Sequence, residues 1–321
     1  MAERVRTWGR WGAEDELGTL NFITAAKLVE AASMVRTGKL FPLGVNLDSE
    51  GPQGASGSRR NPIHLMILDG NDQHFTLDSE RQGSAAERMV SSYFQRGPAR
   101  WTDDYVMMPL QAATQWDALA HAYYDGQLYN GYPASSISSL GAARDSIDKV
   151  DRKGIVSRGV LLDVARHRGL EHLPPLEEIQ PEELDAVAEA QGVMIRSGDI
   201  VLIRTGWWQR FILDGNGPEW MRGCPGVHWR VAEWLYDRDI AAVAADNTAV
   251  EAASVPEADD MVMPFHLLCL RDMVLMLGEM WNLEELSRDC AEDGVYEFQL
   301  IAPPLRVTGA VGSPLNPIAI K

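Results

Sequence analysis

Short apolar runs alternate with amphipathic runs through the second half of the chain, and this alternation restricts the fold more than any other feature. Residues 159–165, 198–206 and 240–246 are short and apolar, as buried strands are. The intervening runs at 181–192 and 227–239 have the apolar spacing of amphipathic helices. A strand–helix–strand order of this kind predicts an α/β fold.

Further runs toward both ends extend this pattern. We expect additional strands at 62–70, 295–305 and 306–314, and a helix at 23–39 with Thr24 as N-cap and Gly38 after its end. Because several of the predicted strands follow one another without a helix between them, the central sheet is expected to be mixed rather than purely parallel.

The chain shows no internal repeat and no low-complexity linker. Of its 321 residues, 45% are hydrophobic and 23% are charged, the balance of an ordinary soluble globular protein. We therefore expect one domain over residues 1–321, with residues 1–60 as an N-terminal extension packed on it. Stretches rich in Gly, Ser, Pro and Asn at 51–61, 70–87 and 214–226 predict long loops of the kind that often bind ligands.

Charge and cysteine usage exclude several classes of partner. The net charge is −17, which argues against nucleic acid and against an anionic membrane surface. No run of 18 apolar residues and no apolar signal-peptide core are present. The cysteines are Cys224, Cys269 and Cys290, with no C-x-x-C pair, so we expect a cytoplasmic protein.

The chemistry-bearing run is QAATQWDALAH, residues 111–121. Gln115 and Asp117 lie two residues apart, so in an extended segment they share a face. Asp117 offers a hard anionic oxygen that can bind a divalent cation, and His121 is suited to moving a proton near neutral pH. Taken alone, these residues fit equally well a turn capped by Asp117 and a buried, hydrogen-bonded His121.

A second cluster lies in the apolar stretch 264–286. His266 and Glu279 are surrounded there by leucines, methionines and valine. A buried glutamate carries a large desolvation cost unless it is paired or binds a cation. Asp117, His266 and Glu279 together make a plausible divalent-metal site; the alternative is that Glu279 pairs with Arg271 or another buried base.

The run 111–121 resembles the signature H-x-G-T-H-x-D-x-x-x-H of the cyclase family that includes bacterial kynurenine formamidase and isatin hydrolase. Thr114, Asp117 and His121 match it, Ala113 replaces the glycine, and glutamines replace the first two histidines at Gln111 and Gln115. His266 and Glu279 resemble the downstream histidine and the glutamate before Asn-Leu. The resemblance extends over most of the chain, through the blocks at 10–22, 198–208, 224–246 and 306–320.

This resemblance implies a swivelling β/β/α-type cyclase fold with long loops, and a homodimer or homotetramer. It implies one metal site on the signature histidines and aspartate, and a second on the aspartate, the downstream histidine and the glutamate. Carried over, the metal ligands are Asp117, His266 and Glu279, with Gln115 as a tentative fourth. His121 and Glu279 are the implied catalytic residues. The oxygen-rich ligand set favours manganese over zinc, and the two glutamines leave room for a site without metal.

Substrate-binding residues are expected beside the signature. We predict Gln111, Gln115, Trp116, Tyr124 and, from an earlier segment, His64. Three functions fit these residues. The first is a metal-dependent hydrolase of an amide, imide or lactone that uses metal-activated water and a histidine general acid/base. The second is a metal-independent cyclase, dehydratase or isomerase that uses His121 and Glu279, and the third is a non-catalytic small-molecule binder.

Overall fold

Two compact units make up the described part of the chain. The computed structural model describes residues 1–53, 58–69, 101–150, 153–215, 220–221, 223–253 and 261–321. One unit contains residues 1–61 and 109–321, and the other contains residues 62–108. The expected loop at 70–87 lies outside the described residues, as do parts of 51–61 and 214–226. The single domain expected over 1–321 stays a prediction.

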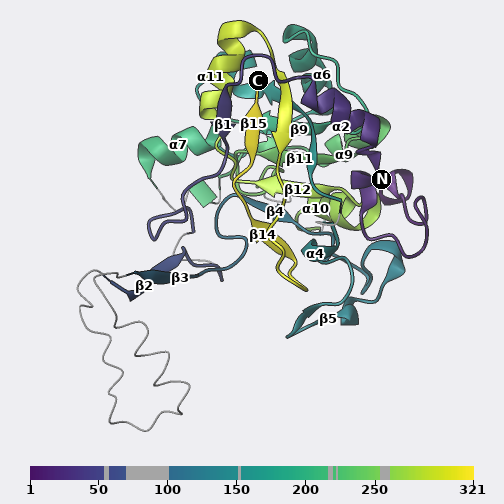
Figure 1. The fold of residues 1–321 in the computed structure, drawn as a ribbon. Helices are drawn as coiled ribbons and strands as arrows, with labels where there is room; N and C mark the ends of the chain where they lie inside the picture. The colour runs from purple at the N-terminus through teal and green to yellow at the C-terminus, as the bar shows by residue number, and fades with distance from the viewer. Residues whose placement is uncertain (54–57, 70–100, 151–152, 216–219, 222, 254–260) are drawn as a thin grey trace. The chain divides into compact units, whose positions relative to one another are not determined.

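A nine-stranded sheet runs through the larger unit (Figure 1). Its strand order is β1-β15-β13-β7-β9-β11-β12-β4-β14. The strands are β1 Leu40–Pro42, β15 Ile318–Ile320, β13 Glu297–Ile301, β7 Val156–Asp163, β9 Ile200–Arg204, β11 Ala242–Ala245, β12 Met276–Glu279, β4 Gln115–Asp117 and β14 Gly312–Pro314. The four strands β7, β9, β11 and β12 are parallel, and every other pairing in the sheet is antiparallel. The predicted mixed α/β architecture is confirmed.

Helices connect the parallel strands and cover the sheet. The α-helices are α1 Ala2–Val5, α2 Ala25–Ala32, α4 Ile147–Val150, α5 Val164–His167, α6 Pro181–Ala190, α7 Trp207–Asp214, α9 Val231–Asp237, α10 Pro264–His266 and α11 Glu284–Asp293. Shorter turns are η1 Gly18–Phe22, η2 Tyr129–Gly131 and η3 Ala134–Ser136, and η4 Leu267–Met273 is a π-helical segment. Two small pairs complete the unit, β5 Ile137–Ser138 with β6 Gly141–Ala142, and β8 Glu178–Ile179 with β10 Gly226–Val227.

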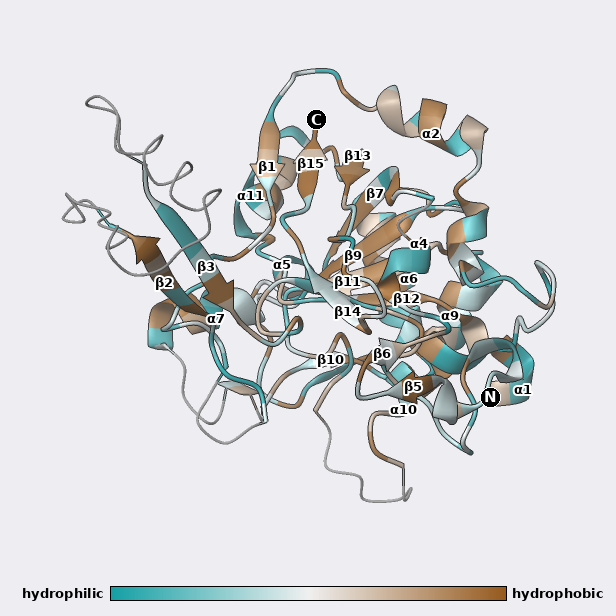
Figure 2. Cartoon of the chain, turned by 60° about the horizontal axis from the view of Figure 1, so that its bottom comes forward, coloured by the Kyte–Doolittle hydropathy of each residue, from teal (hydrophilic) through white to brown (hydrophobic). Residues whose placement is uncertain are grey.

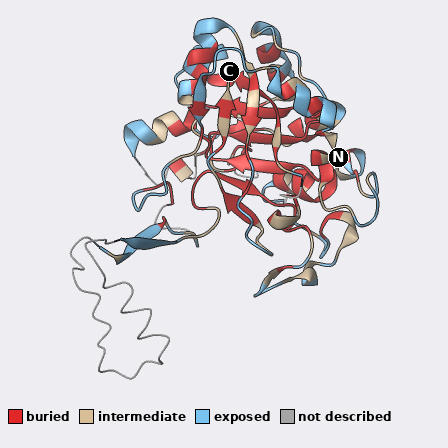
Figure 3. Ribbon diagram, in the orientation of Figure 1, coloured by how far each residue is buried: buried red, intermediate tan, exposed pale blue. Residues whose placement is uncertain are grey.

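Both faces of the sheet are buried, which explains why its central strands are apolar throughout. Along β7, Val160 and Leu162 belong to one core cluster, while Leu161 packs with Leu202 of β9 in the other. The central strands are hydrophobic in Figure 2 and buried in Figure 3, whereas the outward faces of the surrounding helices are exposed. Continuous apolar strands are typical of parallel sheets covered on both sides.

Several predicted boundaries are corrected. The helix expected over 227–239 is confined to Val231–Asp237, because Val227 pairs with Ile179 in the β10–β8 pair. The helix expected over 23–39 has the predicted N-cap, where the Thr24 hydroxyl accepts a hydrogen bond from the Lys27 N–H, but it ends at Ala32. The strand expected over 306–314 is confined to Gly312–Pro314, because the preceding residues form a turn in which the Ala310 N–H donates to the Val307 carbonyl.

The smaller unit contains the antiparallel pair β2 Ile63–Leu68 and β3 Asp103–Met107. The strand predicted at 62–70 is therefore confirmed. In the described part of the chain, no helix is long and apolar enough to cross a membrane.

Asp145 predicts a pH dependence of stability. Its side chain is completely buried, and neither carboxyl oxygen has a hydrogen-bond partner among the described residues. Burial, with a contribution from the Glu16 carboxylate, raises the pKa of Asp145 to about 8. A carboxyl whose pKa is raised on folding contributes stability at low pH that is lost as the pH rises toward the folded pKa. The protein should therefore lose stability between about pH 4 and pH 8.

We expect D145N to remove this part of the loss, because an amide does not ionise. Relative to the wild type, the variant should gain at least about 1 kcal/mol in unfolding free energy between pH 4 and pH 8, measured by urea unfolding. The matched control is D148N. Although burial alone raises the pKa of Asp148, hydrogen bonds from the Gly309 N–H and the Ser146 hydroxyl lower it overall. D148N should therefore be less stable than the wild type at pH 7. Parallel pH profiles for D145N and wild type would contradict the assignment.

Candidate active site

The register between β4 and β12 brings the signature run against the second cluster. Gln115 pairs directly with Glu279, and Asp117 pairs with Leu277. Because side chains two residues apart on a strand share a face, Gln115, Asp117 and Glu279 all project from the same side of the sheet. Trp116 projects from the other side and packs on Trp281 with ring centroids 5.0 Å apart.

A short helix places His266 over this face. Pro264 occupies the first turn of α10, where its fixed φ and missing N–H suit a helix start. The chain then continues directly into η4, whose Leu268, Cys269 and Leu270 are buried in the core that this face of the sheet contributes to. This packing anchors the helix, so His266 is buried beside the two strands.

Three of the predicted metal ligands converge. Asp117, His266 and Glu279 each offer a ligand atom, and these atoms all lie within 4.8 Å of one another. His266 Nε2 lies 3.1 Å from Glu279 Oε1 and 3.8 Å from Asp117 Oδ2. Asp117 Oδ2 is buried and has no hydrogen-bond partner among the described residues. A buried carboxylate oxygen facing a histidine and a second carboxylate fits a divalent cation.

Gln115 separates the two carboxylates. Its Nε2 donates to Glu279 Oε2 at 2.6 Å and to Asp117 Oδ1 at 3.2 Å, while its Oε1 is buried and has no partner in the described part of the chain. The amide nitrogen therefore donates to both carboxylates at the point where they face each other. Rotation of the same amide would present Oε1 as a neutral oxygen ligand, so the predicted role of Gln115 is compatible with this geometry.

Burial dominates the electrostatics of the cluster. It raises the pKa of Asp117 well above its ordinary range, and the Glu279 carboxylate adds to this rise. Burial alone lowers the pKa of His266, but hydrogen bonds to Glu251 and Glu279 raise it to about 10. The two buried carboxylates are therefore stabilised by the positive charge of His266 or by a proton. A divalent cation at the same point would stabilise them in the same way.

His121 lies at the solvent-facing side of this cluster. The chain turns after β4, where the His121 N–H donates to the Ala118 carbonyl, and its Nε2 comes within 3.8 Å of Asp117 Oδ1. Burial lowers the pKa of His121 to about 4. At neutral pH the imidazole is therefore uncharged and has a free lone pair, which is the form in which a histidine accepts a proton.

The other predicted residues lie in different surroundings. Trp116 is a fully buried core residue whose Nε1 donates to the Ala302 carbonyl, and this position does not fit the predicted substrate-binding role. The amide of Gln111 lies over β14, since a Cβ added at Gly312 would come within 2.5 Å of its Nε2. Tyr124 donates to Asp272 at 2.6 Å. His64 belongs to the smaller unit, where it contacts Asp104 at 2.8 Å.

Glu279 does not pair with Arg271, but it does pair with another buried base, since Glu279 Oε1 lies 3.1 Å from His266 Nε2. Arg271 Nη1 instead lies 2.9 Å from Asp272 Oδ1, and Nη2 donates to the side-chain oxygen of Gln127. The guanidinium carbon of Arg271 lies 3.8 Å from the centroid of the Tyr124 ring. Glu279 is therefore left to the cluster formed by Gln115 and His266.

Two residues near the cluster were missed from the sequence. The Glu251 carboxylate contacts His266 Nδ1 at 2.5 Å. Arg59 donates to the Gln111 carbonyl at 3.3 Å, and its charge acts to lower the pKa of both Asp117 and His121. Neither residue lies in a run with recognisable spacing, and only their three-dimensional proximity reveals them.

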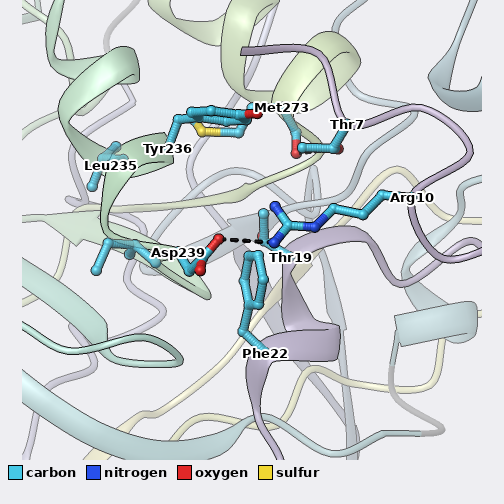
Figure 4. A pocket seen from close by; sticks show the side chains of 9 residues that line it. Thr7, Arg10, Thr19, Phe22, Leu235, Tyr236, Asp239 and Met273 are labelled. Atoms are coloured by element: carbon cyan, nitrogen blue, oxygen red, sulfur yellow. Dashed lines mark hydrogen bonds and ion pairs between the residues drawn. The ribbon is translucent and has the colours of Figure 1, made fainter.

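A separate recess lies between the N-terminal segment and α9 (Figure 4). Arg10 extends across it to Asp239, with Nη2 and Oδ1 3.1 Å apart, and its guanidinium stacks on Phe22. None of the predicted site residues lines this recess.

Comparisons with known proteins identify the family and the fold of the chain. A family model described as "Putative cyclase" matches residues 54–252. A crystal structure of a novel cyclase is 38% identical, with a TM-score of 0.85, covering 99% of this chain and 100% of that one. Isatin hydrolase A from Labrenzia aggregata, bound to benzyl benzoate, is 21% identical with a TM-score of 0.58, covering 92% of this chain and 97% of that one. No curated protein matches the chain.

A predicted metal-dependent hydrolase from Bacillus stearothermophilus shares the fold at 15% identity, with a TM-score of 0.52, covering 88% of this chain and 98% of that one. The chain belongs to the cyclase family, because the family model matches more than half of its length and the novel cyclase is similar over nearly all of it. The predicted family and fold class are confirmed, and with them the expectation of an enzyme of the cyclase family.

The Gln115 amide should contribute measurably to stability. In Q115L a side chain of similar size offers no donor, so the Asp117 and Glu279 carboxylates lose their shared hydrogen bonds while staying buried. We expect the unfolding free energy of the metal-free protein to fall by roughly 1–3 kcal/mol, measured by denaturant unfolding. Q299L, on half-buried Gln299 of β13, is the control and should change stability by less than about 0.5 kcal/mol. Equal stability of Q115L and wild type would contradict this role.

Proposed function

We propose that the protein is a metal-dependent hydrolase of an amide, imide or lactone, with Asp117, His266 and Glu279 as metal ligands and His121 as general acid/base. The observation that carries this proposal is the convergence of three ligand atoms within 4.8 Å, with Asp117 Oδ2 unpartnered among the described residues. The carboxylate and imidazole donors suit manganese, and zinc is the second choice. The small-molecule substrate, the homodimer or homotetramer and the cytoplasmic location remain predictions from the sequence.

A divalent cation bound at this cluster would polarise a carbonyl and lower the pKa of water. The chain's own residues supply the remaining chemistry. Neutral His121 accepts the proton of the attacking water at Nε2 and returns it to the departing nitrogen or oxygen. The side-chain amide of Gln111 can donate hydrogen bonds to a substrate oxygen, since its amide group is a double donor. Glu279 and Asp117 hold the negative charge that attracts the cation.

One observation favours the metal-independent alternative. The Gln115 amide already bridges both carboxylates, so the cluster has neutral hydrogen-bond partners without a cation. In that case His121 and Glu279 would perform acid/base chemistry on a bound substrate, and the two glutamines would hold its oxygen.

Metal content and single substitutions test the hydrolase proposal. We expect protein purified without chelator to contain about one divalent ion per chain by elemental analysis. D117N and H266A should lose the ion and at least about 100-fold in kcat/KM toward isatin or a panel of simple cyclic amides and lactones. Circular dichroism checks that both variants are folded. Absence of bound metal, with turnover unchanged by added metal or exhaustive chelation, would instead support the metal-independent alternative.

His121 has a separate test. H121A should lower kcat by about 100- to 10,000-fold while leaving metal content unchanged, because this side chain moves the proton rather than holding the ion. H167A, on an exposed histidine at the end of α5, is the control and should retain full activity. Full activity of H121A would argue against both enzymatic mechanisms.

Gln115 distinguishes this chain from the family signature. Q115H restores an imidazole, a stronger zinc ligand than an amide, and removes the donor that occupies the carboxylates. We expect zinc affinity to rise at least about 10-fold by isothermal titration calorimetry. Equal or weaker zinc binding in folded Q115H would show that position 115 does not face the ion.

A further inference from the structure

Glu251 is a buried carboxylate whose side-chain hydrogen-bond partners, among the residues that the structure describes, belong to the start of α10. Its Oε1 accepts hydrogen bonds from the backbone N–H of His266 at 2.9 Å and from His266 Nδ1 at 2.5 Å. Its Oε2 accepts from the backbone N–H of Phe265 at 3.2 Å. One side chain thus fixes both the backbone and the imidazole of His266.

The turn that presents Glu251 is strained. Val250 has a φ of 58°, a left-handed conformation that β-branched residues rarely adopt. The side chain of Asn247 holds this turn, since its Oδ1 accepts from the Val250 N–H at 2.8 Å and its Nδ2 donates to the Val250 carbonyl at 3.1 Å. Strain of this kind persists only where the surrounding structure enforces it, and it is concentrated at functional sites.

Close packing beneath the turn leaves no room for adjustment. A Cβ added at Gly226 would lie 2.3 Å from the Val250 carbonyl oxygen and 2.4 Å from the Glu251 carbonyl carbon. Glu251 also forms an isolated parallel bridge with Val227. The position of the carboxylate is therefore set by β10 and by the loop after β11, independently of the residues that form the cluster.

The consequence concerns the second nitrogen of the imidazole. Since Nδ1 is held by Glu251, Nε2 is the nitrogen directed at Glu279 and Asp117. We propose that Glu251 is a positioning residue that keeps Nδ1 of His266 protonated and hydrogen-bonded, so that Nε2 alone is presented to the cluster. A carboxylate behind a ligating histidine fixes its ring orientation and increases its basicity as a ligand.

A purely structural role for Glu251 would leave a different pattern. The N–H groups of Phe265 and His266 are the unpaired donors expected at a helix start, and capping them stabilises α10 without any effect on which nitrogen faces the cluster. The two roles can be separated because they use different oxygens in part: Oε1 accepts both His266 bonds, whereas Oε2 caps the Phe265 N–H. In E251Q an amide oxygen in place of Oε1 keeps the bond to His266 Nδ1, while the amide NH2 in place of Oε2 no longer caps the helix start; E251L removes all of these bonds.

The first test uses metal-free protein, so its outcome does not depend on the proposed hydrolase function. We expect a low-field, exchange-protected Nδ1 proton of His266 in the ¹H–¹⁵N spectrum of the wild type, assigned by its loss in H266Q. E251L should lose this resonance and E251Q should retain it. Absence of the resonance in the wild type, or its persistence in folded E251L, would overturn the proposal. The wild-type measurement stands even if E251L does not fold.

The second test rests on the proposed function and measures Mn²⁺ and Zn²⁺ binding by calorimetry. E251L should weaken binding about 10- to 100-fold, and E251Q should recover most of the loss. E297Q, on the half-buried Glu297 of β13 that pairs with Arg158, is the matched control and should bind metal as the wild type does. Unchanged affinity in folded E251L would overturn the positioning role. Failure of the wild type to bind either metal would instead count against the proposed function, while the spectroscopic result would still decide the role of Glu251.

Discussion

The antiparallel contact between β4 and β12 is the interaction on which the candidate site depends. It sets Gln115 opposite Glu279 and places Asp117 on the same face. A shift of β4 by one residue in this register would turn Gln115 and Asp117 into the opposite core and bring Trp116 to the face of Glu279. The register is fixed in turn by packing, because Trp116 fills the other face against Trp281 and hydrogen-bonds to Ala302.

Burying two carboxylates at one point is costly, and the structure offsets this cost with three different partners. Gln115 gives both carboxylates a neutral donor, His266 gives Glu279 a charge-assisted hydrogen bond, and Glu251 supports His266 from behind. Apart from the contact between Gln115 and Asp117 within β4, these contacts join different segments of the sequence. The cluster therefore forms only when the sheet, α10 and the loop after β11 are all in place, which links the integrity of the site to the whole larger unit.

The sequence predicted the elements well and the site in part. Apolar runs identified β7, β9 and β11, because strands buried on both faces need nonpolar residues throughout. His266 and Glu279 were identifiable because a buried ionisable side chain in an apolar stretch carries a desolvation cost unless it is paired, and Asp117 because its run resembles the family signature. Glu251 was not identifiable, since it lies in an irregular loop and its role depends on a left-handed Val250 that no pattern predicts. The substrate-binding role predicted for Trp116 does not fit its position. Side chains alternate along β4, so Trp116 lies in the core on the face opposite Gln115 and Asp117.

The contacts of Gln115 explain what an amide does at this position. An imidazole at position 115 would leave the carboxylates without a shared donor in the metal-free state and would favour permanent metal occupancy. An amide has two faces of opposite polarity, so the same side chain can satisfy the carboxylates through Nε2 or offer Oε1 to a cation. On the proposed function, the protein would stay folded without metal and bind metal less tightly than a chain with an imidazole at position 115. Gln115 would then couple metal binding to an amide rotation.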